Sequence, residues 1–167
     1  MSRVYIKKLK IKYFELKHAD KFTKINFGST REIYVSKTGT KNSIFKLEYN
    51  AEWVYHNVEE YVIYKNNYKE YNFLARIKGI TKDYRVLEME KLNTESIETM
   101  AKNAKYTIDS IFDLVNNYPE LNNKIDFDWD DVDTFIKKNK LEEEEIYYYK
   151  NWALNKEGKL RLVDYSR

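Results

Sequence analysis

Asn151 and Asp164 form the polar pair in this sequence that is best suited to chemistry. They lie 13 residues apart, and Asp164 ends an apolar segment that includes Leu162 and Val163. An aspartate at the end of a buried strand is costly unless its carboxylate binds something. The simpler alternative is that Asp164 caps a turn. The pair is therefore a candidate ligand site, with turn capping as the competing interpretation.

Lys46 is the second candidate, together with a glutamate that follows it. Lys46 stands between Phe45 and Leu47 in an apolar segment, and Glu59 and Glu60 lie in the next segment with helical spacing. A lone lysine in a strand usually faces solvent, and two adjacent glutamates in a helix are usually solvated. They are candidates for a site only because of their place in the order of segments along the whole chain.

Composition excludes several other kinds of site. The chain has no cysteine and two histidines, His18 and His56, so disulfides, thiolate zinc sites and cysteine nucleophiles are excluded and a Ser-His-Asp triad has little support. The 30 basic and 27 acidic residues give a net charge of +3. This balance is too even to indicate a nucleic acid or a membrane as partner.

Length and hydropathy indicate one folded domain. The 167 residues are 43% hydrophobic and 16% aromatic, which is enough to bury a core. No apolar run reaches the roughly 18 residues of a membrane helix, and the first residues lack the apolar run of a signal peptide. We expect a soluble cytoplasmic protein with no membrane partner.

The first half of the sequence shows the alternation that is typical of strands, interrupted by one helix. Apolar residues of the helix recur at Val54, Val58, Tyr61 and Val62. The expected elements are an edge strand over 4–13, strands leading to Gly28 and at 33–35 and 43–47, a helix over 53–67, and strands over 73–80 and 84–89. From the segment before Gly28 onward, the order is βββαββ.

The second half is mainly helical. Apolar residues recur in steps of three, four and one from Ile97 to Val115, which predicts a single long helix after the capping residues Asn93 and Thr94. A second helix is expected to start near Asp128–Asp131, because carboxylates suit a helix N-terminus. Its expected buried residues are Trp129, Val132, Phe135 and Ile136. A hairpin over 152–163, with its turn at 155–158, ends the chain.

This order of parts resembles that of a protein kinase. The resemblance covers residues 20–92 and 142–166. In the first part, Asn26–Val35 resembles the phosphate-covering turn, Ile44–Leu47 contains the strand lysine, and Asn57–Tyr61 contains the helix carboxylate. Val86–Leu92 resembles the strand that enters the hinge. Asn151–Ser166 resembles the end of the catalytic loop together with the D-F-G segment. The separation of Asn151 and Asp164 is the usual one in kinases.

The resemblance implies a site for ATP and magnesium. A fixed lysine would face the phosphates, a helix carboxylate would hold that lysine, and asparagine and aspartate oxygens would bind Mg²⁺. Glu60 is favoured over Glu59 by its place in the segment 57–61. The implied nucleotide-binding residues are Gly28, Lys46, Glu60, Glu90 and Leu92, and the implied metal ligands are Asn151 and Asp164.

Four departures from the family argue against efficient phosphotransfer. The resemblance puts Ile146 at the position of the kinase general base, and the nearest carboxylate is that of Glu145, which is a candidate base. The turn at Gly28 has one glycine instead of three. Ser166 replaces the glycine of D-F-G, and no activation segment is expected.

We therefore expect an α+β fold. Its predicted parts are a kinase-like N-lobe over residues 1–92, with a five-stranded antiparallel sheet and one helix, and a reduced helical part with a terminal hairpin over 93–167, in one compact domain. The expected function is binding of a host protein, with ATP and Mg²⁺ as ligands and without efficient phosphotransfer. Small size and residues with AT-rich codons indicate a phage origin and hence the host cytoplasm.

Two alternatives remain open from the sequence. One is a small active protein kinase in which Glu145, or another carboxylate brought in by the fold, serves as the base. The other is a nucleic-acid-binding protein that uses tyrosines and the lysines of the edge strand, Lys7, Lys8, Lys10 and Lys12.

Overall fold

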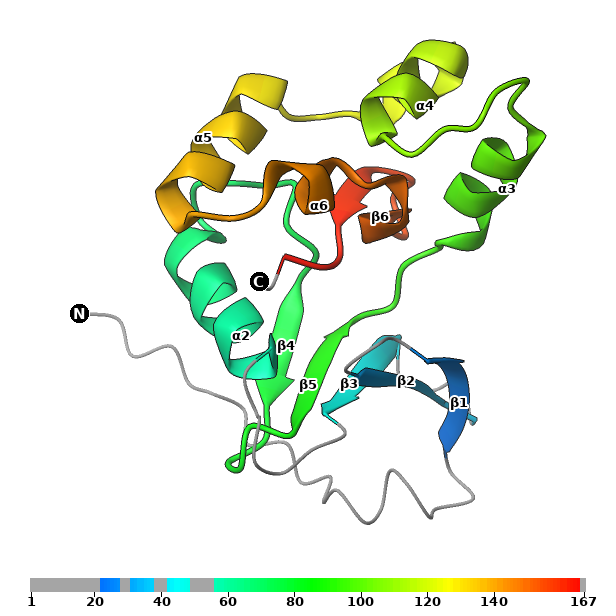
Figure 1. Ribbon diagram of the computed structural model, residues 1–167. Coiled ribbons are helices and arrows are strands. Elements are labelled where there is room, and N and C mark those ends of the chain that lie inside the picture. The colour runs from blue at the N-terminus through cyan, green and yellow to red at the C-terminus, as the bar shows by residue number, and fades with distance from the viewer. Residues whose placement is uncertain (1–21, 28–30, 38–41, 49–55, 166–167) are drawn as a thin grey trace. The chain divides into compact units, whose positions relative to one another are not determined.

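The computed structural model describes residues 22–27, 31–37, 42–48 and 56–165 (Figure 1). The predicted edge strand over 4–13, Gly28 and Ser166 lie outside the described residues. The chain divides into two compact units, one of residues 1–62 and 76–91 and one of residues 63–75 and 92–167. No described helix combines the length and the apolar character needed to span a membrane.

The first unit is built on a five-stranded antiparallel sheet with the strand order β1-β2-β3-β5-β4. Its strands are β1 (Phe22–Phe27), β2 (Arg31–Ser36), β3 (Ser43–Glu48), β4 (Ile77–Ile80) and β5 (Val86–Glu90), and α2 (His56–Asn67) follows β3. The predicted order βββαββ is confirmed for these elements, as is the α+β class.

Alternation along β3 separates an apolar side of the sheet from a polar one. Phe45 and Leu47 form a buried cluster with Tyr34 of β2 and Val86 of β5. Lys46, which lies between them in the strand, points to the opposite side. The same lysine is only 4% exposed, so it does not face solvent as a lone strand lysine usually does.

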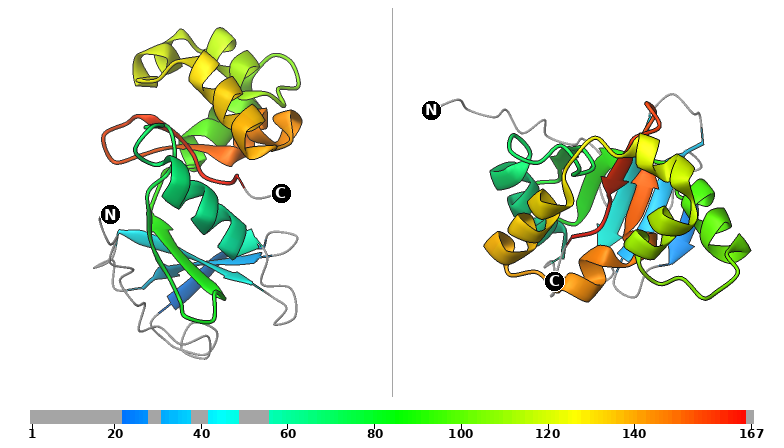
Figure 2. Two further views of the ribbon diagram at one scale, coloured as in Figure 1. Left: turned by 90° about the vertical axis from the view of Figure 1, so that its left-hand side faces the viewer. Right: turned by 90° about the horizontal axis from the view of Figure 1, so that it is seen from above.

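The second unit combines helices with a small hairpin. Its helices are α3 (Glu95–Asn103), α4 (Ile111–Asn117), α5 (Trp129–Asn139) and α6 (Glu143–Tyr147), with the 3₁₀ segments Pro119–Lys124 and Tyr149–Asn151. The hairpin pairs β6 (Trp152–Leu154) with β7 (Leu160–Leu162), as predicted. In the view from above in Figure 2, α4 and α5 flank this hairpin.

Two other segments extend the hairpin on its two sides. Leu74 forms a parallel bridge to Leu162, and the N–H of Ala75 donates to the Leu162 carbonyl at 2.9 Å. On the other side, Asn93 and Leu154 exchange two backbone hydrogen bonds, at 2.8 and 3.0 Å. The end of the segment 63–75 and the start of the segment 92–167 are therefore both bonded to the hairpin.

An aromatic cluster fills the centre of the second unit. Phe73 and Trp152 are fully buried, and the ring of Phe73 contacts those of Phe127, Phe135 and Trp152 at 5.3, 5.4 and 6.3 Å. Trp152 donates its indole N–H to the Ile146 carbonyl at 2.7 Å, which satisfies its one polar group. These contacts explain why residues 63–75 belong to the second unit, whereas the sequence assigned them to the first.

The predicted long helix over 97–115 is wrong. It is two helices, because Ala104 ends α3 in an extended conformation and Ser110 caps α4 by accepting a hydrogen bond from the Phe112 N–H at 3.1 Å. The apolar period continues across the break, since Ile108 is also buried. Periodicity alone therefore concealed the interruption.

Two smaller differences concern element ends and burial. The predicted strand over 73–80 is a strand only over 77–80, since residues 73–75 pair with β7 instead. The helix predicted near Asp128 is α5, and the side chain of Asp128 caps it by accepting from the Asp130 N–H at 3.1 Å. Val132, Phe135 and Ile136 are buried as expected, but Trp129 is only partly buried.

Gly158 closes the hairpin turn with φ of +74°, a conformation that costs an L-residue roughly 1–2 kcal/mol. A Cβ there meets only the Lys124 ammonium, at 4.0 Å, so the cost comes from the backbone. We expect Gly158→Ala to lower the free energy of unfolding by about 1 kcal/mol, measured by urea denaturation. Lys156→Ala in the same turn is the control, and an equal effect of the two substitutions would contradict the prediction.

Candidate functional site

The buried ion pair between Lys46 of β3 and Glu60 of α2 is the centre of the candidate site. The Lys46 Nζ lies 2.6 Å from Glu60 Oε1, and the two residues are 4% and 0% exposed. Glu59 is partly exposed. The predicted pairing of the strand lysine with Glu60, in preference to Glu59, is therefore confirmed as a contact, whereas the nucleotide-binding role of the pair stays a prediction.

A second cation shares the same carboxylate. Arg31 of β2 donates from Nη1 to Glu60 Oε2 at 2.5 Å, and Arg31 is 5% exposed. Each oxygen of Glu60 thus accepts from a different cation. The three side chains together carry one net positive charge.

Asn57 and Glu48 fix the first turn of α2 to the sheet. Asn57 Nδ2 donates to the carbonyls of Lys46 and Arg85, at 3.1 and 2.9 Å. The N–H of Asn57 donates to Glu48 Oε1 at 2.7 Å, so a carboxylate satisfies one of the unpaired donors at the helix N-terminus. Because Glu60 lies one turn after Asn57, these bonds position its carboxylate for Lys46.

This arrangement can hold an ammonium group in a fixed place beside a polyanion. An ammonium has three donors, and its position here is set by a carboxylate on a helix that is itself bonded to the sheet. The ammonium of Lys46 and the guanidinium of Arg31 are the kinds of group that phosphate oxygens bind. The sequence analysis missed Arg31, Asn57 and Glu48. Arg31 and Glu48 are register partners in β2 and β3, so opposite charges in neighbouring strands were the available signal.

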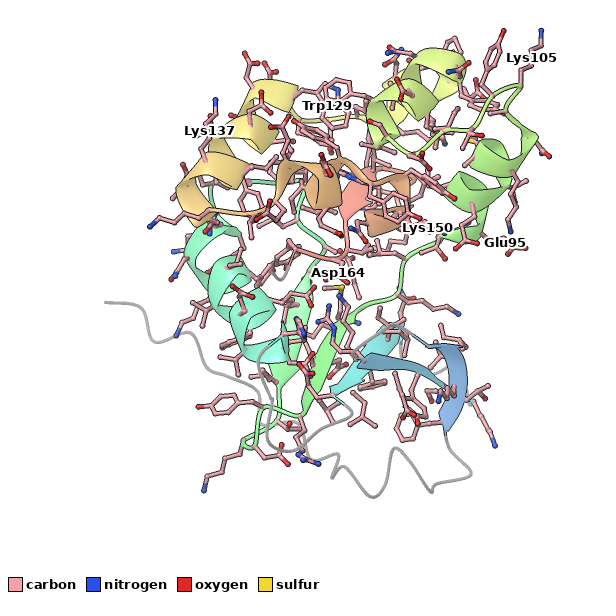
Figure 3. All side chains as sticks on the ribbon, in the orientation of Figure 1. Glu95, Lys105, Trp129, Lys137, Lys150 and Asp164 are labelled. Carbon is pink, nitrogen blue, oxygen red and sulfur yellow. The ribbon has the colours of Figure 1, made fainter. Side chains whose placement is uncertain are left out.

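The second unit brings Asn151 and Asp164 near each other across the hairpin. The N–H of Val163 donates to the Asn151 carbonyl at 2.7 Å, which places Asp164 one residue beyond this pair (Figure 3). Asn151 donates from Nδ2 to the Glu145 carbonyl at 2.7 Å, and this bond orients its amide. Its oxygen is an acceptor of the kind that Mg²⁺ binds.

Asn151 and Asp164 form a set of two ligands. Among the residues that the structure describes, no group of three or more His, Cys, Asp or Glu side chains is arranged to hold a metal ion. A magnesium ion that is bound through nucleotide phosphates requires only one or two protein ligands. The metal-binding role of Asn151 and Asp164 stays a prediction.

Glu90 and Leu92 lie where β5 ends. The N–H of Glu90 donates to Arg76 and the N–H of Lys91 to Asn42, at 2.9 and 3.2 Å, and Asn93 bonds to Leu154. Of the four consecutive N–H groups of residues 90–93, that of Leu92 has no backbone acceptor within the described part of the chain. It is thus the donor in this segment that remains for a ligand.

The two remaining candidates are Gly28 and Glu145. Gly28 lies outside the described residues. Glu145 is exposed on α6, next to Ile146, which is 2% exposed and is the residue that the resemblance puts at the general-base position. A side chain at position 146 is thus buried in the core of the second unit.

Comparison with known proteins adds no family assignment. A scan against protein-family models and a search of the curated proteins both gave no match to this chain.

Because two cations share Glu60, we expect loss of Glu60 to lower the free energy of unfolding more than loss of Lys46 does. Glu60→Ala leaves two buried cations without their carboxylate, and we expect it to cost about 3–5 kcal/mol in free energy of unfolding. Lys46→Met leaves Glu60 paired with Arg31, so we expect a cost below about 2 kcal/mol. Urea denaturation of both variants measures the difference.

The double variant Arg31→Met/Lys46→Met is the control for this prediction. It leaves a buried carboxylate alone and should cost nearly as much as Glu60→Ala. Equal costs for Lys46→Met and Glu60→Ala would contradict the shared pairing.

Proposed function

We propose that this protein is a kinase-like module that binds a nucleoside triphosphate with Mg²⁺ and acts by binding a partner protein, without efficient phosphotransfer. The single observation that carries the nucleotide part is the buried pair of Lys46 and Glu60 at 2.6 Å. The partner would be a host protein if the chain is of phage origin.

The energetics of the pair support a binding role. Replacing a buried ion pair by apolar residues of similar volume is often neutral or stabilising, so such a pair is weak evidence for stability alone. A lysine kept buried and oriented by a helix carboxylate has the geometry needed to neutralise phosphate oxygens. Arg31 adds a second positive charge at the same place.

The segment at the end of β5 supports adenine as the base that is bound. Adenine recognition needs main-chain donors and acceptors, and the N–H of Leu92 is available for this purpose. Asn151 and Asp164 are the proposed magnesium ligands, through oxygens of an amide and a carboxylate.

The surroundings of Ile146 support the absence of phosphotransfer. A base must come within hydrogen-bond reach of the substrate hydroxyl. Ile146 cannot remove a proton, and its side chain packs in the core. Binding, without transfer, is the activity that these residues support.

We expect ATP with Mg²⁺ to raise the melting temperature. At a ligand concentration about 100 times the dissociation constant, the stabilisation is roughly 2.7 kcal/mol. Lys46→Met should remove most of the shift, whereas Lys82→Met, at an exposed lysine of the same unit, should leave it unchanged. Differential scanning fluorimetry measures all three proteins.

Magnesium dependence tests the second unit separately. Asp164→Asn should reduce the difference between ATP with and without Mg²⁺, and Asp113→Asn, at an exposed aspartate, is the matched control. An unchanged melting curve of the unmodified protein at millimolar ATP would refute nucleotide binding.

Phosphotransfer is expected to be undetectable on generic protein substrates. General-base assistance contributes typically 10² to 10⁴ in rate, and loss of substrate alignment adds to this deficit. The measurement is transfer of radiolabelled γ-phosphate, with Glu145→Gln to test the remaining candidate base. Efficient transfer that Lys46→Met or Glu145→Gln abolishes would replace this proposal with that of a small active kinase.

A further inference from the structure

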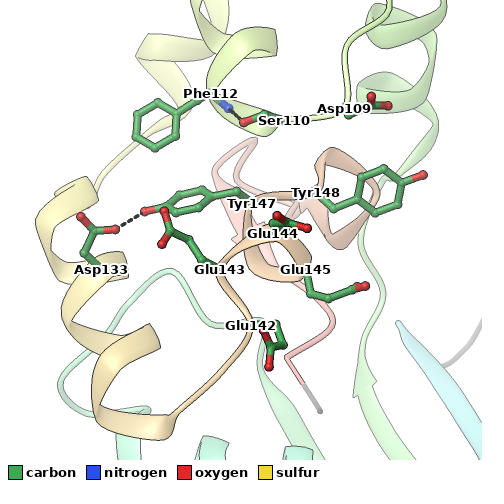
Figure 4. A pocket seen from close by; sticks show the side chains of 10 residues that line it. All are labelled: Asp109, Ser110, Phe112, Asp133, Glu142, Glu143, Glu144, Glu145, Tyr147 and Tyr148. Atoms are coloured by element: carbon green, nitrogen blue, oxygen red, sulfur yellow. Dashed lines mark hydrogen bonds between the residues drawn. The ribbon is translucent and has the colours of Figure 1, made fainter.

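A large acidic cavity lies within the second unit. Its volume is about 1120 Å³, and α4, α5, α6 and the segments next to them line it (Figure 4). Six of its ten lining residues are carboxylates, and none is basic. The carboxylates are Asp109, Asp133, Glu142, Glu143, Glu144 and Glu145.

The six carboxylates of the cavity have no paired cation among the residues that the structure describes. Elsewhere in the unit, carboxylates do have partners: Glu70 pairs with Lys138, Glu98 with Lys102, Asp126 with Arg161 and Glu157 with Lys156. Six carboxylates without an ion pair in the described part of the chain thus line one concave surface.

Aromatic rings form the other part of the cavity wall. The Tyr147 ring packs on Phe112 at 5.1 Å and on Trp129 at 6.0 Å, and its hydroxyl donates to Asp133 Oδ1 at 2.6 Å. Burial, followed by this hydrogen bond and nearby carboxylates, raises the pKa of Tyr147 above its usual value. The phenol therefore stays neutral and leaves the charge of the cavity to the carboxylates.

The chain itself shows that a ring at this wall accepts a cation. The Lys150 ammonium lies 5.4 Å from the centre of the Tyr148 ring and 5.8 Å from that of Tyr149. A hydrogen bond with Tyr148 raises the pKa of Lys150. Tyr148 lines the cavity, so its ring combines with the carboxylates in a surface suited to ammonium or guanidinium groups.

Backbone bonds hold the two sides of the cavity together. Ser110 and Tyr148 form an antiparallel bridge, and the Tyr149 N–H donates to the Asp109 carbonyl at 2.9 Å. The cavity is therefore formed before a ligand arrives, which reduces the entropic cost of binding.

We propose that this cavity binds a Lys/Arg-rich peptide segment of the partner protein. Charge complementarity selects a cationic occupant. The cavity volume of about 1120 Å³ has room for several residues of a peptide. The proposal rests on the protein-binding half of the proposed function and is independent of nucleotide binding.

The test is fluorescence anisotropy with a labelled Lys/Arg-rich peptide and a version in which glutamine replaces every basic residue. We expect only the basic peptide to bind, with affinity that falls as salt rises. The triple variant Glu142→Gln/Glu143→Gln/Glu144→Gln should weaken binding by about tenfold or more. The control Glu95→Gln/Glu120→Gln/Glu157→Gln makes the same change in charge at exposed sites of the unit and should change affinity less than about twofold.

A second variant tests the aromatic wall. Tyr148→Leu keeps an apolar side chain but removes the ring, and we expect it to weaken binding of the basic peptide. The control is Tyr106→Leu, at an exposed tyrosine. We expect the melting temperature of the Tyr148 variant to change no more than that of this control. Equal affinity of the Tyr148 and Tyr106 variants would overturn the assignment of the ring.

Three results would overturn the proposal as a whole. They are no binding of the basic peptide, equal losses in the two triple variants, and spermine binding that matches the peptide in affinity and in sensitivity to the cavity variant. The last result would identify a small polycation as the occupant. The shift in melting temperature with ATP, measured on the same cavity variant, should equal that of the unmodified protein, so failure of peptide binding is distinguishable from failure of nucleotide binding.

Discussion

The carboxylate of Glu60 is the constraint on which the first unit depends. Two strands supply cations to it, Arg31 from β2 and Lys46 from β3, and α2 supplies the carboxylate. Charges that are nearly inaccessible to water must be paired, so these three elements can adopt few other arrangements without leaving a charge unpaired. A helix bonded in this way cannot slide along the sheet without breaking several buried polar contacts at once.

Charge is used in opposite ways in the two units. In the first, the charges around Glu60 are buried and matched, so added salt should affect them little. In the second, the carboxylates around the cavity are exposed and unmatched, so their mutual repulsion is screened by salt and relieved by a cation. The buried, paired charges restrict the first unit to one arrangement, whereas the exposed carboxylates of the second unit favour binding of a cationic partner.

The sequence was sufficient for the order of elements in the first unit and for the hairpin, because local alternation and helical spacing encode them, whereas the contact of Lys46 with Glu60 was expected only from the resemblance to a kinase. It was insufficient where distant segments decide the outcome. Nothing in the sequence around Arg31 indicates its role, because the role depends on the pairing of β2 with β3. The apolar period from Ile97 to Val115 likewise continues through the break that precedes the capping residue Ser110. The acidic cavity was equally hidden, since the run from Glu142 to Glu145 was interpreted as a solvated face and Asp109 and Asp133 lie far from it in sequence.

The pairing of residues 73–75 and Asn93 with the hairpin has a consequence for the order of events during synthesis. These segments leave the ribosome well before their partners, Leu154 and Leu162, which lie about 60 to 90 residues later. Until then, Phe73 has no hairpin on which to pack, and its exposed apolar surface is open to chaperones or to other chains. Such long sequence separations also slow folding. The second unit is thus completed late, by a short hairpin to which residues 73–75 and Asn93 are bonded.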